Sequence, residues 1–386
     1  MFLFLLQTSS LLIVGLFLFP HVVLAALIGD ANGDGRVDGI DYAIWLSHYS
    51  QQISGTQNGD FNNDSRIDGL DFVLWLSHYG NILATNTPTA VPNSPTSTPR
   101  PTNTQGVTNT PIPTGTGGSI TFAGAGDIAS CGGPAEATAK QITDLGPNAV
   151  VFAAGDNAYA SGGSYSSGGC YDRTWGVFKN RTYPVVGTHE VSDGIAGYYS
   201  YFGNRVLGPD SKGYYSYDVG SWHILSVNSE LTGGDLTSQL NWVKADLSAH
   251  PNKCIGAVMH MPRYSPQGGN NAALGPVWDA LEDAGAEWTI SAHYPLYERT
   301  YPLNKAGAID NANGIVSFRV GTGGNKGSYY PNVSSPLDAK YQVGSSSGFW
   351  GILKMNLTST GYSFQFTTAP NSPNQNFSDS GSAVCH

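Results

Sequence analysis

Acids and histidines that could bind a metal ion recur in five short segments of the second half of this chain. Each segment directly follows a short apolar run that predicts a buried strand: residues 120–125, 149–154, 183–186, 254–259 and 288–291. The segments themselves are 126–129 (Gly-Asp-Ile-Ala), 155–159 (Gly-Asp-Asn-Ala-Tyr), 187–190 (Gly-Thr-His-Glu), 260–262 (His-Met-Pro) and 292–299 (Ala-His-Tyr-Pro-Leu-Tyr-Glu-Arg). Side chains placed just past strand ends can meet in one crevice at the edge of a sheet. Carboxylate oxygens and imidazole nitrogens gathered there suit zinc, iron or manganese.

The elements that must position these side chains form a mixed α/β pattern over residues 119–386. Strand-like runs alternate with helical patterns at 236–249 and 275–284, and the connections are rich in glycine. With the five segments in this order, the region resembles the calcineurin-like metallophosphoesterases, most closely the purple acid phosphatase branch. The resemblance includes the helical stretch QLNWVKADL and the stretch HYPLYER, which is similar to the GHxHxYER of that family. It implies an α/β fold, a β-sandwich flanked by helices, that hydrolyses phosphomonoesters with a metal-activated water.

The resemblance also implies roles for individual residues of the site, which would hold one or two Fe, Zn or Mn ions. Asp127 and Tyr159 would bind the first metal ion, and Asp156 would bridge both ions. His260 and His293 would bind the second ion. His189 would protonate the leaving group or stabilise the charge of the phosphate. Tyr159 could instead be a packed aromatic side chain.

Two positions depart from the family pattern. Thr188 stands where the family has an asparagine ligand of the second metal ion, and Pro295 stands where it has a histidine ligand of the first. Each ion would therefore lose one protein ligand, a loss that should cost at least the roughly 10–100-fold in affinity or activity known for outer-shell partners. Two hypotheses follow: a working phosphatase with weaker metal binding, or a catalytically degenerate binding or scaffold protein on the same fold.

Residues 29–50 and 59–80 repeat each other at an offset of 30. Each copy places oxygen-bearing residues at positions 1, 3, 5, 9 and 12 of an EF-hand-type loop, with a backbone carbonyl at position 7, and so predicts two Ca²⁺ sites. The predicted ligands are Asp30, Asn32, Asp34, Arg36 (carbonyl), Asp38 and Asp41 in the first loop, and Asp60, Asn62, Asp64, Arg66 (carbonyl), Asp68 and Asp71 in the second. Gly35 supplies the sharp turn at position 6, where the second loop has Ser65.

A short apolar helix follows each loop, and we expect the two helices to pack on each other through residues that include Ile40 and Leu70. The segment 29–80 resembles a dockerin, a duplicated calcium-loop module of the small all-α class that binds cohesin domains of extracellular scaffolds. A cohesin is therefore one expected partner, although the Trp-rich face could dock on another domain of this protein instead.

Bulk composition limits the remaining possibilities. The chain has 386 residues, 40% of them hydrophobic, and a formal charge of −10 without a basic patch, so we expect no nucleic-acid partner. Residues 1–26 are almost wholly apolar and end in small residues, which predicts a signal peptide or, if uncleaved, a membrane anchor. Either way, the rest of the chain would be extracellular. Residues 81–118 are rich in Thr and Pro and predict a linker.

The cysteines Cys131, Cys170, Cys254 and Cys385 all fall in the last domain. An even number in an exported protein favours two disulfides, for which three pairings are possible. The chain has no CxxC spacing, so a cysteine zinc site is not expected.

Overall fold

The computed structural model describes residues 27–37, 39–78, 118–129, 134–159, 165–251, 253–325, 333–343, 349–373 and 375–386. They belong to two compact units, one within residues 1–102 and the other within 103–386. The expected signal peptide or anchor (1–26) and nearly all of the expected linker lie outside the described residues. Of the helices that the structure describes, none combines the length and the apolar composition needed to cross a membrane.

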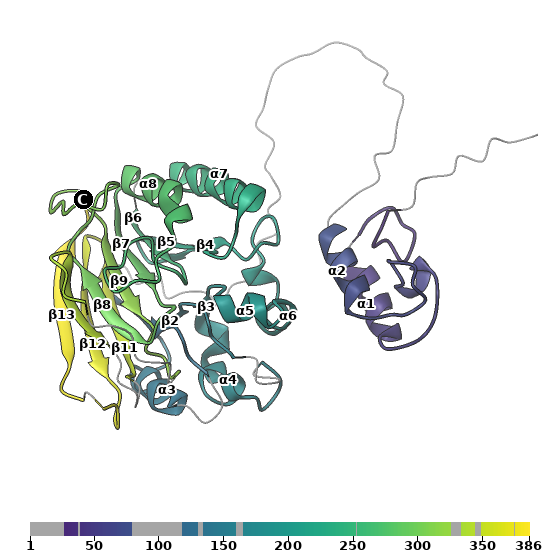
Figure 1. Ribbon diagram of the computed structural model, residues 1–386, viewed down its shortest axis with the longest axis horizontal. Coiled ribbons are helices and arrows are strands. Elements are labelled where there is room, and N and C mark those ends of the chain that lie inside the picture. Colours follow the sequence, from purple (N-terminus) through teal and green to yellow (C-terminus); the bar gives the residue numbers. More distant parts are fainter. Residues whose placement is uncertain are drawn as a thin grey trace, which may run out of the picture. The chain divides into compact units, whose positions relative to one another are not determined.

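The N-terminal unit is a small all-α domain, as the sequence predicts. It contains α1 (Gly39–His48), the short 3-10 helix η1 (Thr56–Asn58) and α2 (Gly69–His78) (Figure 1). The helices contact each other through aromatic rings. The ring centroids of Tyr42 and Trp75 lie 5.1 Å apart, and those of Trp45 and Phe72 lie 5.2 Å apart. So short a segment can bury little apolar surface, and these four aromatic side chains supply much of what it buries.

The expectation that Ile40 and Leu70 belong to this contact is wrong. Their exposed fractions are 57% and 62%. A helix turns 100° per residue, so the face that carries residues 42 and 45 turns residue 40 outward, and the repeat places Leu70 in the same way.

The C-terminal unit contains two β-sheets, and the predicted α/β fold is confirmed (Figure 1). The first sheet has the order β13-β12-β11-β1-β2-β3, and the second has the order β10-β8-β9-β7-β6-β5-β4. The strands of the first sheet are β1 (Ile120–Ala125), β2 (Val150–Ala153), β3 (Thr182–Pro184), β11 (Gly351–Thr358), β12 (Gly361–Thr368) and β13 (Ser378–Val384). Those of the second are β4 (Tyr215–Val219), β5 (Trp222–Ser226), β6 (Cys254–Val258), β7 (Ala286–Ser291), β8 (Leu296–Thr300), β9 (Val316–Val320) and β10 (Asp338–Val343).

The main hydrophobic core lies between the two sheets. Phe122 of β1 lies 5.9 Å from Trp288 of β7, and Phe318 of β9 lies 4.9 Å from Phe364 of β12, measured between ring centroids. All four side chains are buried. These contacts join strands of opposite sheets, so the sheets pack face to face as a sandwich.

Helices cover the outer surfaces of this sandwich. The long α7 (Gly233–Ala249) and α8 (Gly275–Asp283) pack on the outer face of the second sheet and share a second core with β5 and β6 (Figure 1). Both helices form where the sequence predicts them. The remaining helical segments are α3 (Ala135–Asp144), α4 (Cys170–Arg173), η2 (Trp175–Arg181), α5 (Thr188–Ser192), α6 (Ala196–Phe202), η3 (Asn204–Val206) and η4 (Ala272–Leu274).

All five strands predicted to precede the candidate ligands are present, as β1, β2, β3, β6 and β7. The third strand is shorter than predicted and begins one residue earlier: the sequence predicts residues 183–186, and β3 spans Thr182–Pro184. One disulfide joins Cys254 at the start of β6 to Cys385, and Cys170 is also disulfide-bonded. Cys131 lies outside the described residues. The covalent link fixes the C-terminal end of the chain to the second sheet.

Candidate metal centre

The candidate ligands lie where parallel strands of both sheets end. Strands β1 and β2 run parallel in the first sheet, as do β6 and β7 in the second. Backbone pairing continues past the strand ends: the Asp127 N–H donates to Gly155 O (3.0 Å), and the Ala292 N–H donates to His260 O (2.8 Å). These bonds keep residue 127 beside 156 and residue 260 beside 293.

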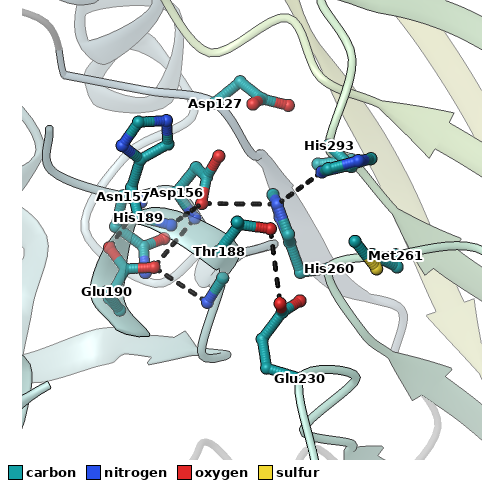
Figure 2. Close-up of polar contacts among 12 residues, drawn as sticks. Asp127, Asp156, Asn157, Thr188, His189, Glu190, Glu230, His260, Met261 and His293 are labelled. Carbon is teal, nitrogen blue, oxygen red and sulfur yellow. Dashed lines mark hydrogen bonds and ion pairs between the residues drawn. The ribbon is translucent and has the colours of Figure 1, made fainter. Parts of the chain in front are cut away.

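Four of the predicted residues meet in this place (Figure 2). Ligand atoms of Asp127, Asp156 and His260 all lie within 4.8 Å of one another, and the three side chains are buried. His260 Nε2 lies 3.3 Å from Asp156 Oδ1 and also 3.3 Å from His293 Nδ1. Residues far apart in the sequence therefore present two carboxylates and two imidazoles to one small volume.

The backbone is strained at three of these four residues. Asp127, Asp156 and His293 have φ angles of 53°, 48° and 77°, in the left-handed region that costs a non-glycine residue roughly 1–2 kcal/mol. Such strain persists only where the surroundings enforce it, and it concentrates at functional sites. The turns aim the three side chains away from their strands and toward each other.

Asp127 carries an oxygen that needs a partner. Its Oδ1 accepts a hydrogen bond from the Tyr159 hydroxyl (2.9 Å), but its buried Oδ2 has no hydrogen-bond partner among the described residues. Burial and the charge of Asp156 raise the pKa of Asp127 to about 6. An unsatisfied buried carboxylate oxygen is costly, and a bound cation would satisfy it.

His260 is oriented for a ligand role. Its Nδ1–H donates to the carbonyl of Ala154 (3.0 Å), which leaves Nε2 facing Asp156. Metal-binding histidines commonly have such a bond from the second ring nitrogen to a carbonyl. Burial lowers the pKa of His260, but the nearby Asp156 and Asp127 carboxylates outweigh it and raise the pKa to about 10. Burial raises the pKa of Asp156, but His260 outweighs burial and lowers it.

His293 has the opposite character. Burial and the positive charges of His260 and Arg319 lower its pKa to about 4. The ring is thus neutral near pH 7, the form in which imidazole binds metals. The Arg319 guanidinium packs over the Tyr294 ring and donates to Ala292 O (2.8 Å), so it also holds the segment that carries His293.

Tyr159 and His189 lie side by side at this site, with ring centroids 4.3 Å apart. The His189 backbone N–H donates to Asp156 Oδ1 (2.7 Å), and its Nδ1 faces Asp193 Oδ2 at 3.4 Å. The side chain is partly exposed, with Nε2 not engaged by Asp193. Burial, with the charges of Asp127 and Asp156, raises the pKa of Tyr159 well above its usual range, so its hydroxyl remains a donor.

The carboxylate of Glu190 holds the loops together, a role that sequence reasoning missed. It accepts hydrogen bonds from the backbone N–H groups of Asp156 (2.9 Å), Asn157 (2.9 Å), Ala158 (3.3 Å) and Gly187 (2.8 Å) and from the Tyr165 hydroxyl (2.8 Å). Burial and the charge of Asp156 raise its pKa to about 7. The available signal was a glutamate at the third position of helix α5, where a capping residue reaches back to the helix start.

Glycine is required where these loops approach most closely. A Cβ at Gly187 would lie 2.1 Å from Asp156 N, and one at Gly155, whose φ is +80°, would lie 2.6 Å from His260 Nδ1. Neither distance is possible for a real side chain, so both glycines are needed for Asp156 to reach His260.

The two substituted family positions contribute differently. Pro295 is buried just before β8 and has no donor atom to offer. Thr188 opens α5, and its hydroxyl donates to Glu230 Oε2 at 3.4 Å (Figure 2). The donor set that remains, two carboxylates, two imidazoles and a phenol, still fits a transition-metal ion.

A second group, Asp218, His223 and His250, also brings potential ligands together. Both ring nitrogens of His223 are already engaged, Nδ1 with Asp218 (2.9 Å) and Nε2 with Asp246 (2.7 Å). His250 ends α7 and its Nδ1 bonds Asp246 O. These contacts make His223 a satisfied strand histidine and His250 a helix-end residue.

The N-terminal loops have the shape of calcium loops. Asp41 at position 12 is buried, and its Oδ1 accepts from Ala31 N and Asn32 N; Asp71 bonds Phe61 N and Asn62 N in the same way. Position 6 has φ of 81° at Gly35 and 67° at Ser65, so Ser65 adopts a conformation that glycine adopts more easily. Asp38 lies outside the described residues.

The remaining predicted calcium ligands line the same two loops. Asp30 bonds Gly33 N and Gly35 N, and Asp60 bonds Asp64 N and Ser65 N. Asn32 and Asp34, like Asn62 and Asp64, bond each other, while Asp68 bonds Leu70 N. Arg36 N and Arg66 N donate to Asp34 and Asp64.

Comparison with known proteins separates the two domains. Residues 28–79 match the model of the dockerin type I domain. The chain is 27% identical over 234 residues to Purple acid phosphatase 18 of Arabidopsis thaliana, an alignment that covers 54% of this chain and 50% of that protein. The chain thus spans about half the length of this curated relative.

Solved structures share the fold of the C-terminal domain. The purple acid phosphatase PPD1 of yellow lupin (Lupinus luteus) superposes with a TM-score of 0.56 at 17% identity, over 68% of this chain and 54% of that one. GAP50, described as the anchor in the inner membrane complex of Plasmodium, gives a TM-score of 0.51 at 12% identity, over 70% and 90%. The chain therefore combines an N-terminal dockerin domain with a purple-acid-phosphatase-like phosphoesterase fold.

Proposed function

We propose that the C-terminal domain is a metal-dependent phosphoesterase that hydrolyses phosphomonoesters. The observation that carries the proposal is the buried cluster of Asp127, Asp156 and His260, whose ligand atoms lie within 4.8 Å of one another. The unsatisfied Oδ2 of Asp127 and the similarity to Purple acid phosphatase 18 support it.

In this proposal, Asp127 and Tyr159 hold one cation, His260 and His293 hold a second, and Asp156 lies between them. When bound, Fe, Zn or Mn ions supply Lewis acidity to the phosphoryl group and to an attacking water. His189 has the position of a proton donor: Asp193 faces its Nδ1, which leaves the Nε2 side for the leaving group. Glu190 keeps Asp156 in place through the backbone.

The experiment is hydrolysis of p-nitrophenyl phosphate by the full chain supplied with Zn²⁺, Mn²⁺ or Fe. We expect turnover that Asp156→Ala abolishes and that Asp144→Ala, a substitution of an exposed aspartate on α3, leaves unchanged. Turnover no higher than that of Asp156→Ala with every metal would refute the proposal.

A second candidate function is favoured by Thr188 and Pro295, which replace two family ligands. In this alternative the domain is a degenerate binding or scaffold module. GAP50 has the same fold and is described as an anchor, and a fold alone does not determine activity. The double substitution Thr188→Asn with Pro295→His decides between them. A rise from background to clear turnover would favour the degenerate module. A change in turnover of less than about tenfold would favour the working enzyme.

For the N-terminal domain we propose calcium-dependent binding to a cohesin of an extracellular scaffold, after secretion directed by residues 1–26. Ile40 and Leu70 support this, because the repeat exposes the two apolar side chains at equivalent positions near the helix starts. Pull-down with a cohesin panel should succeed in Ca²⁺ and fail in chelator. Capture that survives the chelator, or that Ile40→Asp with Leu70→Asp does not weaken, would count against it.

A further inference from the structure

A further acidic side chain, Glu230, lies at the edge of the candidate metal centre. Glu230 follows β5, the strand next to β6, and two hydrogen bonds join the two segments beyond the strand ends. Val227 N donates to Val258 O (2.8 Å), and Met261 N donates to Ser229 Oγ (2.9 Å). Residues 229 and 230 are therefore held beside His260.

The Glu230 carboxylate accepts two hydrogen bonds, and a third hydrogen bond holds the Glu230 backbone. The Ser229 hydroxyl donates to Oε1 (3.1 Å), the Thr188 hydroxyl donates to Oε2 (3.4 Å), and the Glu230 backbone N–H donates to Asn228 Oδ1 (3.0 Å). Figure 2 shows the carboxylate pointing toward Thr188 and His260 rather than away from the site. The side chain is half-buried, and its charge interacts with those of His260 and Asp156.

Thr188 explains why this carboxylate can take part. Threonine is shorter than the asparagine that the family has at this position, and its hydroxyl is a weak ligand. The Thr188 hydroxyl lies 3.4 Å from Glu230 Oε2, so the carboxylate lies beside the residue that stands at the asparagine position. A carboxylate is also a stronger ligand for a transition-metal dication than an amide oxygen, because it adds a negative charge.

We propose that Glu230 is a ligand of the second metal ion and replaces the asparagine that Thr188 has displaced. Together with His260, His293 and Asp156, it gives that ion two nitrogen and two oxygen ligands from the protein. The inference rests on the metal site of the proposed function but not on turnover, so metal binding alone tests it.

The test is a Co²⁺ titration of the full chain saturated with Ca²⁺, followed by visible absorption and by metal content. We expect two Co²⁺ ions on the wild type at the centre. Glu230→Gln should weaken the affinity for the second Co²⁺ ion at least ~10-fold. Glu136→Gln, which changes an exposed glutamate of α3, should bind Co²⁺ as the wild type does. Thr188→Asn in the Glu230→Gln background should restore most of the affinity.

Thr188→Ala separates a ligand from a hydrogen-bond acceptor. This substitution removes the hydroxyl that donates a hydrogen bond to Glu230 but keeps the Glu230 carboxylate. The Kd for Co²⁺ should therefore change less than about threefold. Equal losses in Thr188→Ala and Glu230→Gln would overturn the proposal, as would an unchanged Glu230→Gln or a wild type that binds one ion only. Missing hydrolysis beside a clear difference in Co²⁺ binding would refute the proposed function and leave this inference intact.

Discussion

Replacing Glu190 by glutamine should disrupt the metal centre without touching any of its ligands. Each carboxylate oxygen accepts at least two backbone N–H groups: Oε2 those of Asp156 and Gly187, Oε1 those of Asn157 and Ala158. Glutamine has one oxygen and one NH₂ group. In either orientation the NH₂ group faces two backbone donors, so two hydrogen bonds are lost.

The structure gives the size of this effect. At a pH well above its pKa of about 7, the Glu190 carboxylate is charged. A hydrogen bond to a charged group contributes about 1.5–3 kcal/mol, so two lost bonds should then lower the free energy of unfolding of the C-terminal domain by about 3–6 kcal/mol. For a domain of this size that corresponds to a fall in melting temperature of at least roughly 6 °C. Tyr165→Phe removes a single donor to the same carboxylate and should cost about 1.5–3 kcal/mol, half of the loss in Glu190→Gln.

Calorimetry of the Ca²⁺-saturated chain measures the loss of stability. Hydrogen exchange followed by mass spectrometry measures the loosening of the loops that Glu190 holds. In Glu190→Gln the amides of Asp156, Asn157, Ala158 and Gly187 should lose protection before the strands do. Metal affinity should fall with them, because Asp156 is no longer held. A variant within 1 kcal/mol of the wild type, with unchanged exchange in these segments, would refute the role assigned to Glu190.

Three further predictions concern proton release on metal binding, loop strain and pH-dependent stability. The pKa of His260 is raised to about 10, that of Tyr159 is raised well above its usual range, and that of Asp127 is raised only to about 6. Metal binding at pH 7.5 should therefore release about two protons per site, one from His260 and one from Tyr159. Titration calorimetry in two buffers would contradict this by finding none. Ser65→Gly should tighten the second calcium loop by about 2–5-fold in Kd, since it relieves a left-handed serine; weaker Ca²⁺ binding would argue against strain there. His223 is desolvated by burial, yet Asp246 and Asp218 raise its pKa, so the stability it contributes is full below pH ~6.5 and is lost as the pH rises through its folded value. Urea denaturation across pH 5.5–9 should show this loss in the wild type but not in His223→Gln. The same pH dependence of the free energy of unfolding in both proteins would contradict the prediction.

The sequence predicted most of what positions the site. The apolar runs before residues 127, 156, 260 and 293 are buried strands, apart from the half-buried first two residues of β1. A continuous apolar run best indicates such an arrangement. Parallel pairing then places their ends at a common edge. The duplicated loop pattern was equally informative, because ligand spacing in a calcium loop is a local property.

Residues that act through tertiary contacts could not be predicted in this way. The carboxylate of Glu190 bonds a loop more than thirty residues away, and nothing near Glu230 marks it as a neighbour of His260. The error at Ile40 had another cause. The direction of a side chain on the helix decides its burial: the spacing of Tyr42 and Trp45 defines the buried face, and Ile40 lies outside it.

We propose that Asp127, Asp156, His260 and His293 bind one metal centre where the strands of the two sheets end. Anomalous diffraction at the zinc or manganese edge, from crystals of the chain grown with that metal, tests it most directly. We predict one or two strong peaks within coordination distance of Asp156 and His260. Metal-loaded crystals with no peak there, or with the metal only elsewhere on the molecule, would contradict the account.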